Sequence, residues 1–448
     1  MTRENEPHAP ASYLQRAMWA AARRYRGTPF NQMIMSSRIQ GPLDVHGLEL
    51  ALGDVIARHA TLRTRLSLTD GQLLQIVEAP EPVSLAPLTV QGTTPDERLH
   101  AAMAILREQG AEVMDLSLRP PVRLRLLRLA EADHVLGFLV HHSMCDGWSS
   151  DVIMRDLTAL YLAHTEDRMA DLPLLSERFA DFSAWEIRTY ESGGFADEIA
   201  YWMEELTNLP PPVELESIVP RRRNRDWSVA GPTSIEPPEV LASLKQLAKN
   251  KGVSLFSVLL AGIAILLHHR TEAEDLIVGI STANRWSKQS MQLVGSFTNL
   301  LPARIRLTGD LAVDEVLRRV HATVRRLVAY GRIPLALILR ESQSLIGTGP
   351  VFPVWCQLRE TSHGLTVGRH AVHFGPFSID RAAIQCDLEA DLSQSHQGLE
   401  CMFAHRSALF AAPSMARLMA DYGGLLRHMA RVSGLRVEAL CEHVCNAR

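Results

Sequence analysis

Two neighbouring runs of different periodicity place a β-sheet in the first part of the chain. Residues 122–129, VRLRLLRL, nearly alternate apolar side chains with arginine, which predicts a strand with one face in water. Residues 134–140, HVLGFLV, are apolar on both faces, which favours a central, buried strand. The two runs together predict a sheet with the second strand well inside it.

Helix-like and strand-like segments alternate over the rest of the sequence. Helical spacing of apolar residues is found at residues 12–22, 48–59, 179–206, 238–267, 312–329 and 413–431. Further strand-like runs lie at residues 275–280 and 299–307. Because helix and sheet are mixed in each half, we expect an α+β fold. A Pro-containing interruption at residues 171–176 places the boundary near 172–178, giving domains 1–175 and 176–448.

The net charge and the apolar runs argue against a nucleic-acid-binding protein, a signal peptide and a membrane span. The 448 residues carry a formal net charge of −4, which argues against a general nucleic-acid-binding surface. Residues 1–12 are polar and lack the apolar core of a signal peptide. The longest apolar run, residues 253–267, is shorter than the ~20 residues of a membrane span, and Ser254 fits the N-cap of a buried helix.

The 6 cysteines are scattered, with neither a CxxC pair nor zinc-finger spacing. We therefore expect no metal site and a reducing, cytoplasmic environment.

Two histidines follow the buried strand, in the run VHHSMCDGWSS at residues 140–150. If the strand continues to residue 142, His142 and His141 point to opposite faces, so only one of them can face a given cleft. An imidazole at a cleft suits proton transfer near neutral pH. The run continues into Asp146-Gly147, a turn signal. Across that turn, Asp146 can lie near the imidazole or pair with an arginine. The alternative is a pair of core histidines bonded to backbone carbonyls; zinc is disfavoured because no third ligand is evident.

Residues 141–147 resemble the HHxxxDG motif of the condensation domains of nonribosomal peptide synthetases. The wider superfamily includes chloramphenicol acetyltransferase. Flanking segments resemble other motifs of the family in the same order: Ser12, Gln15, Met18 and Trp19 (S-x-x-Q-x-x-L-W), 58–64 (RHExLRT), 179–185 (YxDYxxW), 275–279 with Asn284-Arg285 (D-x-x-x-G…GR), and 294–299 (IGxFxN). The resemblance covers about residues 11–435.

The resemblance implies two chloramphenicol-acetyltransferase-like lobes in a V shape, with a tunnel between them. The lobe of residues 1–175 carries HHxxxDG and residues 176–448 form the second lobe. The resemblance also implies an acyl thioester on the phosphopantetheine arm of an acyl or peptidyl carrier protein, and an amine or alcohol acceptor. The enzyme itself then needs no bound cofactor. Because the sequence shows no carrier motif and has no room for an adenylation domain, we expect it to act in trans.

The resemblance also assigns roles to the motif residues. The expected catalytic set is His142, Asp146, Gly147 and His141. Within it, His142 acts as the base, and His141 makes hydrogen bonds within the core. Gly147 permits a tight loop and a close approach of backbone to substrate. Its N–H, or the hydroxyl of Ser149, is a candidate oxyanion donor.

We expect Asp146 to fasten the loop, because a buried carboxylate without a partner is costly. Arg285 is the first candidate partner and Arg63 the second. The candidates for a substrate channel are Trp148, Ser149, Asn299, Trp355 and Gln357. Core packing is an equal alternative for both tryptophans, and Asn299 is also expected to fix a loop.

Several positions depart from the family pattern. Ala60 replaces the usual Glu and Ala17 the usual Arg. The HQDxPF segment is replaced by residues 330–335, and the RDxSRNPLF segment is hardly visible in 347–354. The changes in these two late segments favour an unusual acceptor.

Two other functions remain alternatives. The first is an O- or N-acyltransferase that uses acyl-CoA, and the second is a non-catalytic module that binds carriers. Epimerases and heterocyclases share the fold, but heterocyclases carry DxxxxD in place of HHxxxDG.

Overall fold

The computed structural model describes residues 8–120, 122–220, 226–342, 352–360, 364–377, 379, 383–431 and 434–445. The chain divides into two compact units, each with a mixed arrangement of helices and strands. The first unit comprises residues 1–194, 283–298 and 362–382, and the second comprises 195–282, 299–361 and 383–448. The expected α+β class is confirmed for both units.

The division between the units differs from the single boundary predicted at 175/176. Helix α5 (Phe179–Glu191) lies in the first unit because it packs on β1 (His8–Pro10). Residues 283–298 also belong there, since Arg285 pairs with Asp146. These long-range contacts have no signature in local composition, so a single cut could not describe them.

The first unit contains two sheets. Its other elements are α1 (Tyr13–Arg24), β2 (Gln32–Gln40), α2 (Val45–Arg58), η1 (Ala60–Arg63), β3 (Thr64–Thr69), β4 (Gln72–Val77), β5 (Leu88–Thr89), α3 (Pro95–Ala111), β6 (Val122–Ala130), β7 (Asp133–His141), α4 (Gly147–Thr165), η3 (Ser290–Gln292), β13 (Leu365–Val367) and β14 (Val372–Pro376). The larger sheet has the order β13-β14-β2-β7-β6-β5, and the smaller one the order β1-β4-β3.

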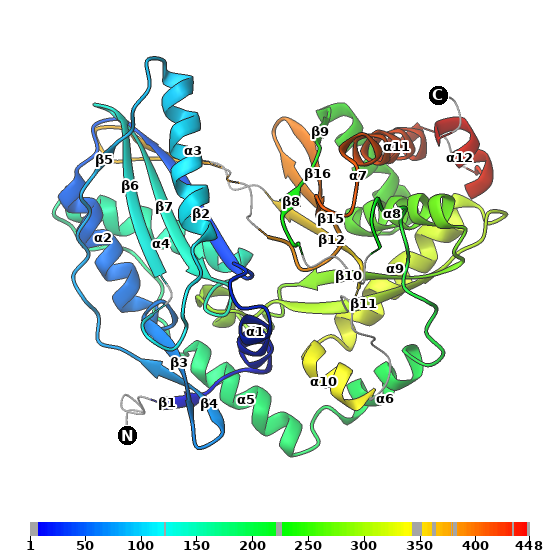
Figure 1. The fold of residues 1–448 in the computed structure, drawn as a ribbon, viewed down its shortest axis with the longest axis horizontal. Helices are drawn as coiled ribbons and strands as arrows, with labels where there is room; N and C mark the ends of the chain where they lie inside the picture. The colour runs from blue at the N-terminus through cyan, green and yellow to red at the C-terminus, as the bar shows by residue number, and fades with distance from the viewer. Residues whose placement is uncertain are drawn as a thin grey trace. The chain divides into compact units, whose positions relative to one another are not determined.

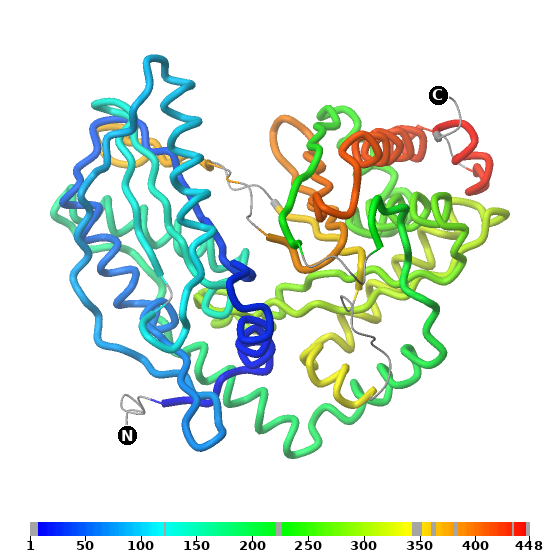
Figure 2. Tube along the Cα trace, in the orientation of Figure 1, coloured from blue at the N-terminus to red at the C-terminus, as the bar shows by residue number. Residues whose placement is uncertain are grey.

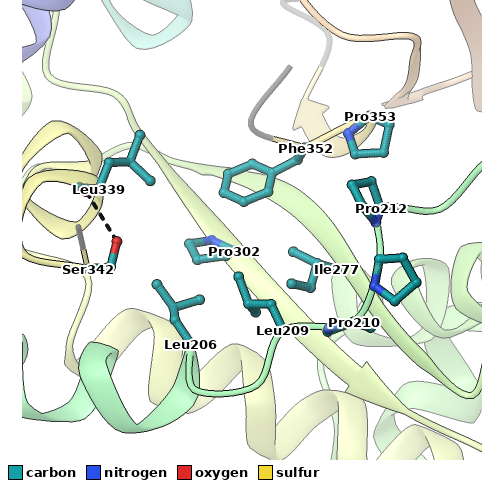
Figure 3. Close-up of a pocket in the computed structure, with 11 residues that line it drawn as sticks. Leu206, Leu209, Pro210, Pro212, Ile277, Pro302, Leu339, Ser342, Phe352 and Pro353 are labelled. Carbon is teal, nitrogen blue, oxygen red and sulfur yellow. Dashed lines mark hydrogen bonds between the residues drawn. The ribbon is translucent and has the colours of Figure 1, made fainter. Parts of the chain in front are cut away.

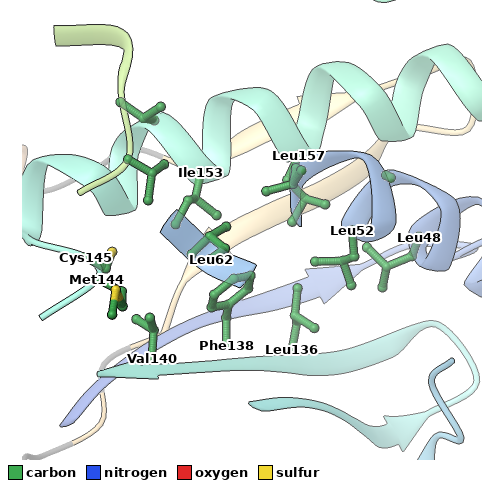
Figure 4. Packing of buried hydrophobic residues seen from close by; sticks show 14 of the residues in the cluster. Leu48, Leu52, Leu62, Leu136, Phe138, Val140, Met144, Cys145, Ile153 and Leu157 are labelled. Atoms are coloured by element: carbon green, nitrogen blue, oxygen red, sulfur yellow. The ribbon is translucent and has the colours of Figure 1, made fainter. Parts of the chain in front are cut away.

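Strand β7 lies inside the larger sheet, between β2 and β6, as the sequence predicts (Figure 1). Leu136, Phe138 and Val140 of β7 pack in a core with residues of α2 and α4 (Figure 4). Val135 and Leu139, on the opposite face, pack in a second core with residues of α3. Apolar side chains on both faces explain why this strand reads as a continuous apolar run.

Two strands from late in the chain complete the larger sheet. Strand β14 pairs antiparallel with β2, and β13 pairs with β14. Figure 2 shows this orange segment beside the blue trace of β2.

The second unit is built on a 7-stranded sheet with the order β11-β10-β12-β15-β16-β8, in which β9 also pairs with β16. Its elements are α6 (Ala196–Glu205), β8 (Val229–Ala230), β9 (Thr233–Glu236), α7 (Pro238–Lys251), α8 (Leu255–Thr271), β10 (Asp275–Thr282), β11 (Asn299–Arg306), α9 (Val313–Ala329), α10 (Leu335–Glu341), β12 (Val354–Glu360), β15 (Leu388–Ser395), β16 (Gly398–Arg406), α11 (Ala412–Arg431) and α12 (Val437–Cys445).

The long helical region predicted at 238–267 is two helices. Gly252 adopts a left-handed conformation, with φ of 64°, and ends α7. Ser254 then caps α8, as predicted, by accepting a hydrogen bond from the Ser257 N–H. In the described part of the chain, no single helix has the length and apolarity to cross a membrane. Helices α7 and α8 meet that test of length and composition only as a pair, bent by 102°.

Candidate active site around His142

The two histidines lie where β7 gives way to a turn. The strand ends at His141, residues 142–144 form the turn, and α4 begins at Gly147. The His142 N–H donates to the carbonyl of Asn31 at 2.5 Å, just beyond the last ladder pair of β2 and β7. The sequence argument from strand parity required a strand through residue 142. That condition is not met, so the position of the His142 ring is set by the turn.

His141 is a buried, neutral imidazole. Its Nδ1 accepts the backbone N–H of Ser143 at 3.1 Å and lies 2.8 Å from the Ser143 hydroxyl. Burial, with a smaller contribution from the neighbouring His142, lowers the pKa of His141 to about 3. His141 is 3% exposed, whereas His142 is only partly buried. Of the two histidines, His142 is therefore the more accessible, and His141 makes the hydrogen bonds within the core that the sequence predicts.

Asp146 has a structural role at the start of α4. It is the N-cap of that helix, and its Oδ1 accepts the Ser149 N–H at 2.8 Å. Its Oδ2 accepts the N–H groups of Phe297 and Thr298 at 3.0 and 3.3 Å. The carboxylate is fully buried. The Asp-Gly pair, interpreted from sequence as a turn signal, is the start of a helix.

Arg285 is the partner of Asp146, as predicted. Its Nη2 donates to Asp146 Oδ1 at 2.8 Å. Its Nη1 donates to the carbonyls of Ser290 and Leu293, and its guanidinium carbon lies 4.1 Å from the Phe297 ring centroid. Burial lowers the pKa of Arg285, while Asp146 opposes that effect. Arg285 thereby holds segment 283–298 against the motif.

Arg63 does not serve as the alternative partner of Asp146. Its Nη1 donates to the backbone carbonyl of Glu78, next to β4. The geometry therefore selects Arg285 from the two candidates that sequence left open.

Ser149 is buried and its hydroxyl is occupied by protein groups. The hydroxyl lies 2.7 Å from Asp146 Oδ1 and accepts the Gly295 N–H at 3.0 Å and Arg285 Nη2 at 2.9 Å. With 0% exposure, it is not available to an oxyanion. The predicted oxyanion and channel roles of Ser149 are wrong, because the hydroxyl is buried and already hydrogen-bonded to Asp146, Arg285 and Gly295.

Gly147 and Trp148 are exposed on the first turn of α4. A Cβ on Gly147 would meet no atom within 4 Å, and its backbone is not left-handed. The predicted need for glycine to form a tight loop is therefore wrong; the open space instead leaves room for a molecule to approach the backbone. Trp148 donates from Nε1 to the Met291 carbonyl at 2.9 Å and is 43% exposed. Its place in a substrate channel stays a prediction.

The remaining channel candidates lie in the second unit. Trp355 donates from Nε1 to the Phe352 carbonyl at 3.0 Å, and Gln357 donates to Glu389 Oε1 at 2.6 Å. Trp355 also packs against the buried cluster of Ile384 and Cys386. Their contact with substrate stays a prediction.

The second unit also contains a pocket with apolar walls. The stretch Pro210–Pro212 forms one side, and Ile277 of β10 and Pro302 of β11 lie on another (Figure 3). Among the described residues that line it, Ser342 has the one polar side chain, and its hydroxyl donates to the Leu339 carbonyl at 3.2 Å. Because none of these described lining residues is titratable, the pocket does not compete with His142 as a site of proton transfer.

The family follows from comparison with known proteins. Residues 5–437 match the family model of the condensation domain. The chain is a member of the condensation-domain family.

The curated relatives of this condensation domain include parts of nonribosomal peptide synthetases. It is 29% identical over 425 residues to a subunit of linear gramicidin synthase from Brevibacillus parabrevis, a match that covers 94% of this chain and 8% of that subunit. It is 30% identical over 421 residues to the phosphinothricin tripeptide synthetase PhsB of Streptomyces viridochromogenes, covering 92% of this chain and 35% of the synthetase. The chain thus spans well under half the length of either relative. Condensation domains of such synthetases generally form amide bonds.

Solved structures confirm the fold. The X-domain from teicoplanin biosynthesis, also solved in complex with OxyB, has 26% identity and a TM-score of 0.84, covering 97% of this chain and 98% of that one. The first condensation domain of the calcium-dependent antibiotic synthetase has a TM-score of 0.83 at 22% identity, covering 97% and 99%.

The altered segment at 330–335 is held by a residue of the family's IGxFxN motif. Asn299 donates from Nδ2 to the carbonyls of Gly331 and Ile333 at 2.9 and 2.7 Å, and its Oδ1 accepts the Leu335 N–H at 3.0 Å. This is the loop-fixing role predicted for Asn299. The other altered segment, at 347–354, falls mostly outside the described residues.

Two contacts of the site were missed from sequence. Ser143 bonds to His141, and its carbonyl accepts a hydrogen bond from Gln15 at 3.1 Å. The Ser12-x-x-Gln15 spacing is a helix-capping signal that predicts a helix start. Nothing in that spacing indicates that the Gln15 side chain reaches the HHxxxDG loop, because the two are far apart in the sequence.

Proposed function

We propose that this condensation domain joins an acyl group, presented as a thioester on the phosphopantetheine arm of a carrier protein, to an amine or alcohol. The observation that carries the proposal is the contrast within the motif. His141 is buried and neutral, and Asp146 is occupied as a cap and ion-pair partner, whereas His142 is partly exposed. His142 is thus the residue of the motif suited to exchange a proton with a substrate.

The chemistry needed of His142 depends on the acceptor. An α-amine has a pKa of about 8, so roughly a tenth is already neutral at pH 7. Its nitrogen attacks the thioester carbonyl, the C–S bond breaks, and the proton lost by nitrogen passes through His142 to the departing sulfur. An alcohol keeps its proton near neutral pH, so ester formation relies more strongly on His142 as the base. Neither reaction consumes an oxidant or a bound cofactor.

We further propose that the carrier is supplied as a separate chain. The condensation-domain model matches residues 5–437, so the carrier that presents the acyl group is not part of this fold and has to dock on it. The altered segment at 330–335 supports an acceptor different from an ordinary aminoacyl carrier, such as a free small molecule.

A panel of loaded carriers tests the proposal. Holo-carrier proteins bearing different acyl groups are incubated with the enzyme and with amines, alcohols or aminoacyl thioesters, and product is followed by intact-protein mass spectrometry. We expect acyl transfer by the parent enzyme and by His100→Ala, in which an exposed histidine on α3 is removed. We expect His142→Ala to lose it. Full transfer by His142→Ala would remove His142 from the mechanism.

The same panel separates the carrier from acyl-CoA. The acyl group of the best carrier substrate is also offered on CoA. Equal or faster turnover with CoA would replace the proposed donor by a soluble thioester.

A non-catalytic role is the second candidate, favoured by one comparison. The X-domain of teicoplanin biosynthesis was solved in complex with OxyB, and this chain is 26% identical to it. If this chain is a non-catalytic module that binds carriers, the parent protein binds loaded carriers but transfers no acyl group with any donor. His142→Ala then leaves carrier binding unchanged.

A further inference from the structure

Gln15 lies at the start of α1, in the first unit, and is completely buried. It is the third residue of that helix and forms a capping box with Ser12. The Ser12 N–H donates to Gln15 Oε1 at 2.9 Å, and the Ser12 hydroxyl accepts the Gln15 N–H at 3.2 Å. The capping box therefore fixes the Gln15 amide with its oxygen toward Ser12.

The amide nitrogen of Gln15 is directed at the loop between the two histidines and Asp146. Its Nε2 donates to the Ser143 carbonyl at 3.1 Å and to Gln75 Oε1 at 3.3 Å, and it lies 3.6 Å from Met144 Sδ. Gln75 is itself held, because its Nε2 donates to the Pro10 carbonyl at 3.0 Å. Both protons of the Gln15 amide thus have buried acceptors, which leaves the group little freedom to turn.

The Ser143 peptide connects this contact to the histidines. Ser143 bonds to His141 Nδ1 through its N–H and hydroxyl, and its carbonyl accepts the hydrogen bond from Gln15. On the far side of the loop, Asp146 is fixed by Arg285. His142 has the Asn31 carbonyl as its backbone acceptor and lies between His141 and Ser143 in the chain. The turn that presents His142 is therefore fixed at both ends.

We propose that Gln15 is a positioning residue for His142, acting through its hydrogen bond to the Ser143 carbonyl. Gln15 lies 128 positions away in the sequence from Ser143 and is buried, so it acts without touching substrate. The inference rests on the proposed acyl transfer and adds to it a residue that sets the geometry of the base.

The test uses Gln15→Leu and Gln15→Glu in the full chain. Gln15→Leu removes the donor, and we expect kcat to fall about 10- to 100-fold with KM nearly unchanged, because a misplaced base affects the chemical step. In Gln15→Glu, an ionised carboxylate offers only acceptors to the oxygens of Ser143 and Gln75, whereas a protonated carboxyl can donate to Ser143 again. We therefore expect the ratio of kcat for Gln15→Glu to kcat for the parent to rise as the pH falls.

The ratio of kcat for Gln15→Glu to kcat for the parent is used because other groups near Gln15 also titrate. Glu186 accepts the Tyr13 N–H at 2.8 Å, and burial raises its pKa to about 7, within the range to be scanned. Arg16, on α1, opposes the rise in the pKa of Glu186. His141 has a pKa of about 3 and so stays neutral over the range to be scanned. Because Glu186 is present in the parent and in the variant, its titration enters the numerator and the denominator of the ratio.

Ser12→Ala is the matched control. It removes the hydroxyl that caps α1 and so weakens the same helix start, but it leaves the Ser12 N–H and the Gln15–Ser143 bond in place. We expect its kcat within a factor of about two of the parent. A kcat for Gln15→Leu no lower than that of Ser12→Ala, or a Gln15→Glu ratio independent of pH, would overturn the proposal.

A second measurement does not depend on turnover. The ring nitrogen and proton resonances of His141 and His142 are compared by NMR in the parent, Gln15→Glu and Ser12→Ala. We expect the ring signals to shift in Gln15→Glu and to return toward those of the parent on acidification. A parent enzyme without acyl transfer but with this response would contradict the proposed function and leave the positioning role standing; histidine signals unchanged by Gln15→Glu would contradict the positioning role alone.

Discussion

Arg285 and Asp146 form a buried ion pair at 2.8 Å that joins two parts of the chain 139 positions apart. Asp146 caps α4 and accepts the backbone N–H groups of Phe297 and Thr298, so one carboxylate fixes a helix start and a distant loop. The pair fixes the start of α4, which directly follows the turn that bears His142.

Removal of one partner of this pair is expected to be costly. Arg285→Ala leaves the buried Asp146 charge without its cation, so we expect a loss of about 3–5 kcal/mol in the free energy of unfolding. Arg319→Ala is the control, because its pair with Glu315 on α9 is exposed and its removal is expected to leave the free energy of unfolding nearly unchanged. Denaturant unfolding followed by circular dichroism measures the free energy of unfolding of both variants. Equal losses would contradict a stabilising role of the Asp146–Arg285 pair.

Ser149→Ala separates a structural hydroxyl from an oxyanion donor. The substitution leaves Asp146 and the Gly295 N–H each short of a buried partner, and we expect a loss of about 1–3 kcal/mol in stability. Because the hydroxyl does not reach substrate, kcat of the folded variant should fall by less than about tenfold. A fall of ~10²–10³-fold in single-turnover assays, typical for loss of an oxyanion donor, would restore the role that the buried geometry removes.

Gly147→Ala is expected to affect activity and leave the fold intact. A Cβ at this position meets no protein atom within 4 Å, and the residue opens a helix, so the free energy of unfolding should change by less than about 0.5 kcal/mol. The methyl group occupies the space beside the first turn of α4, and we expect kcat/KM for acyl transfer to fall. Unchanged kcat/KM in Gly147→Ala and Gly147→Val would show that substrate does not approach this backbone.

Glu186 gives the protein a pH-dependent stability. Burial raises its pKa from 4.5 to about 7, so between these values the unfolded chain loses the proton while the folded protein keeps it. The unfolded state therefore binds fewer protons in this window, and this group lowers stability as the pH rises from about 4.5 to 7. Glu186→Gln keeps an acceptor for the Tyr13 N–H without the charge.

We expect Glu186→Gln to be more stable than the parent by about 1–3 kcal/mol at pH 8 and to equal it near pH 4.5. Thermal unfolding at a series of pH values measures the difference. A stability difference that stays constant from pH 4.5 to 8 would place the Glu186 pKa near its ordinary value. Glu191→Gln, at the exposed end of the same helix α5, serves as the control for adding an amide.

Local sequence was sufficient for the elements around the site. The apolar run of β7 reflects burial on both faces, and Ser254 caps α8 as its side chain and position indicate. The resemblance also predicted the Asp146–Arg285 pair, which the geometry confirms, whereas the role of His142 as the base stays a prediction. The Asp-Gly pair was misinterpreted, because Asp favours both turns and helix N-caps and only the following helix distinguishes the two.

The order of motif segments along the chain by itself determined the family and nominated His142 as the base. Tertiary structure alone decided which partners the motif residues have. In the folded protein, the Ser149 hydroxyl is hydrogen-bonded to Asp146. Asp146 pairs with Arg285, while Arg63 bonds to a backbone carbonyl elsewhere. The Gln15 side chain donates to the Ser143 carbonyl. The physical reason is that capping and strand formation depend on near neighbours, whereas a buried polar group is satisfied by whichever distant segment folding brings within hydrogen-bond distance.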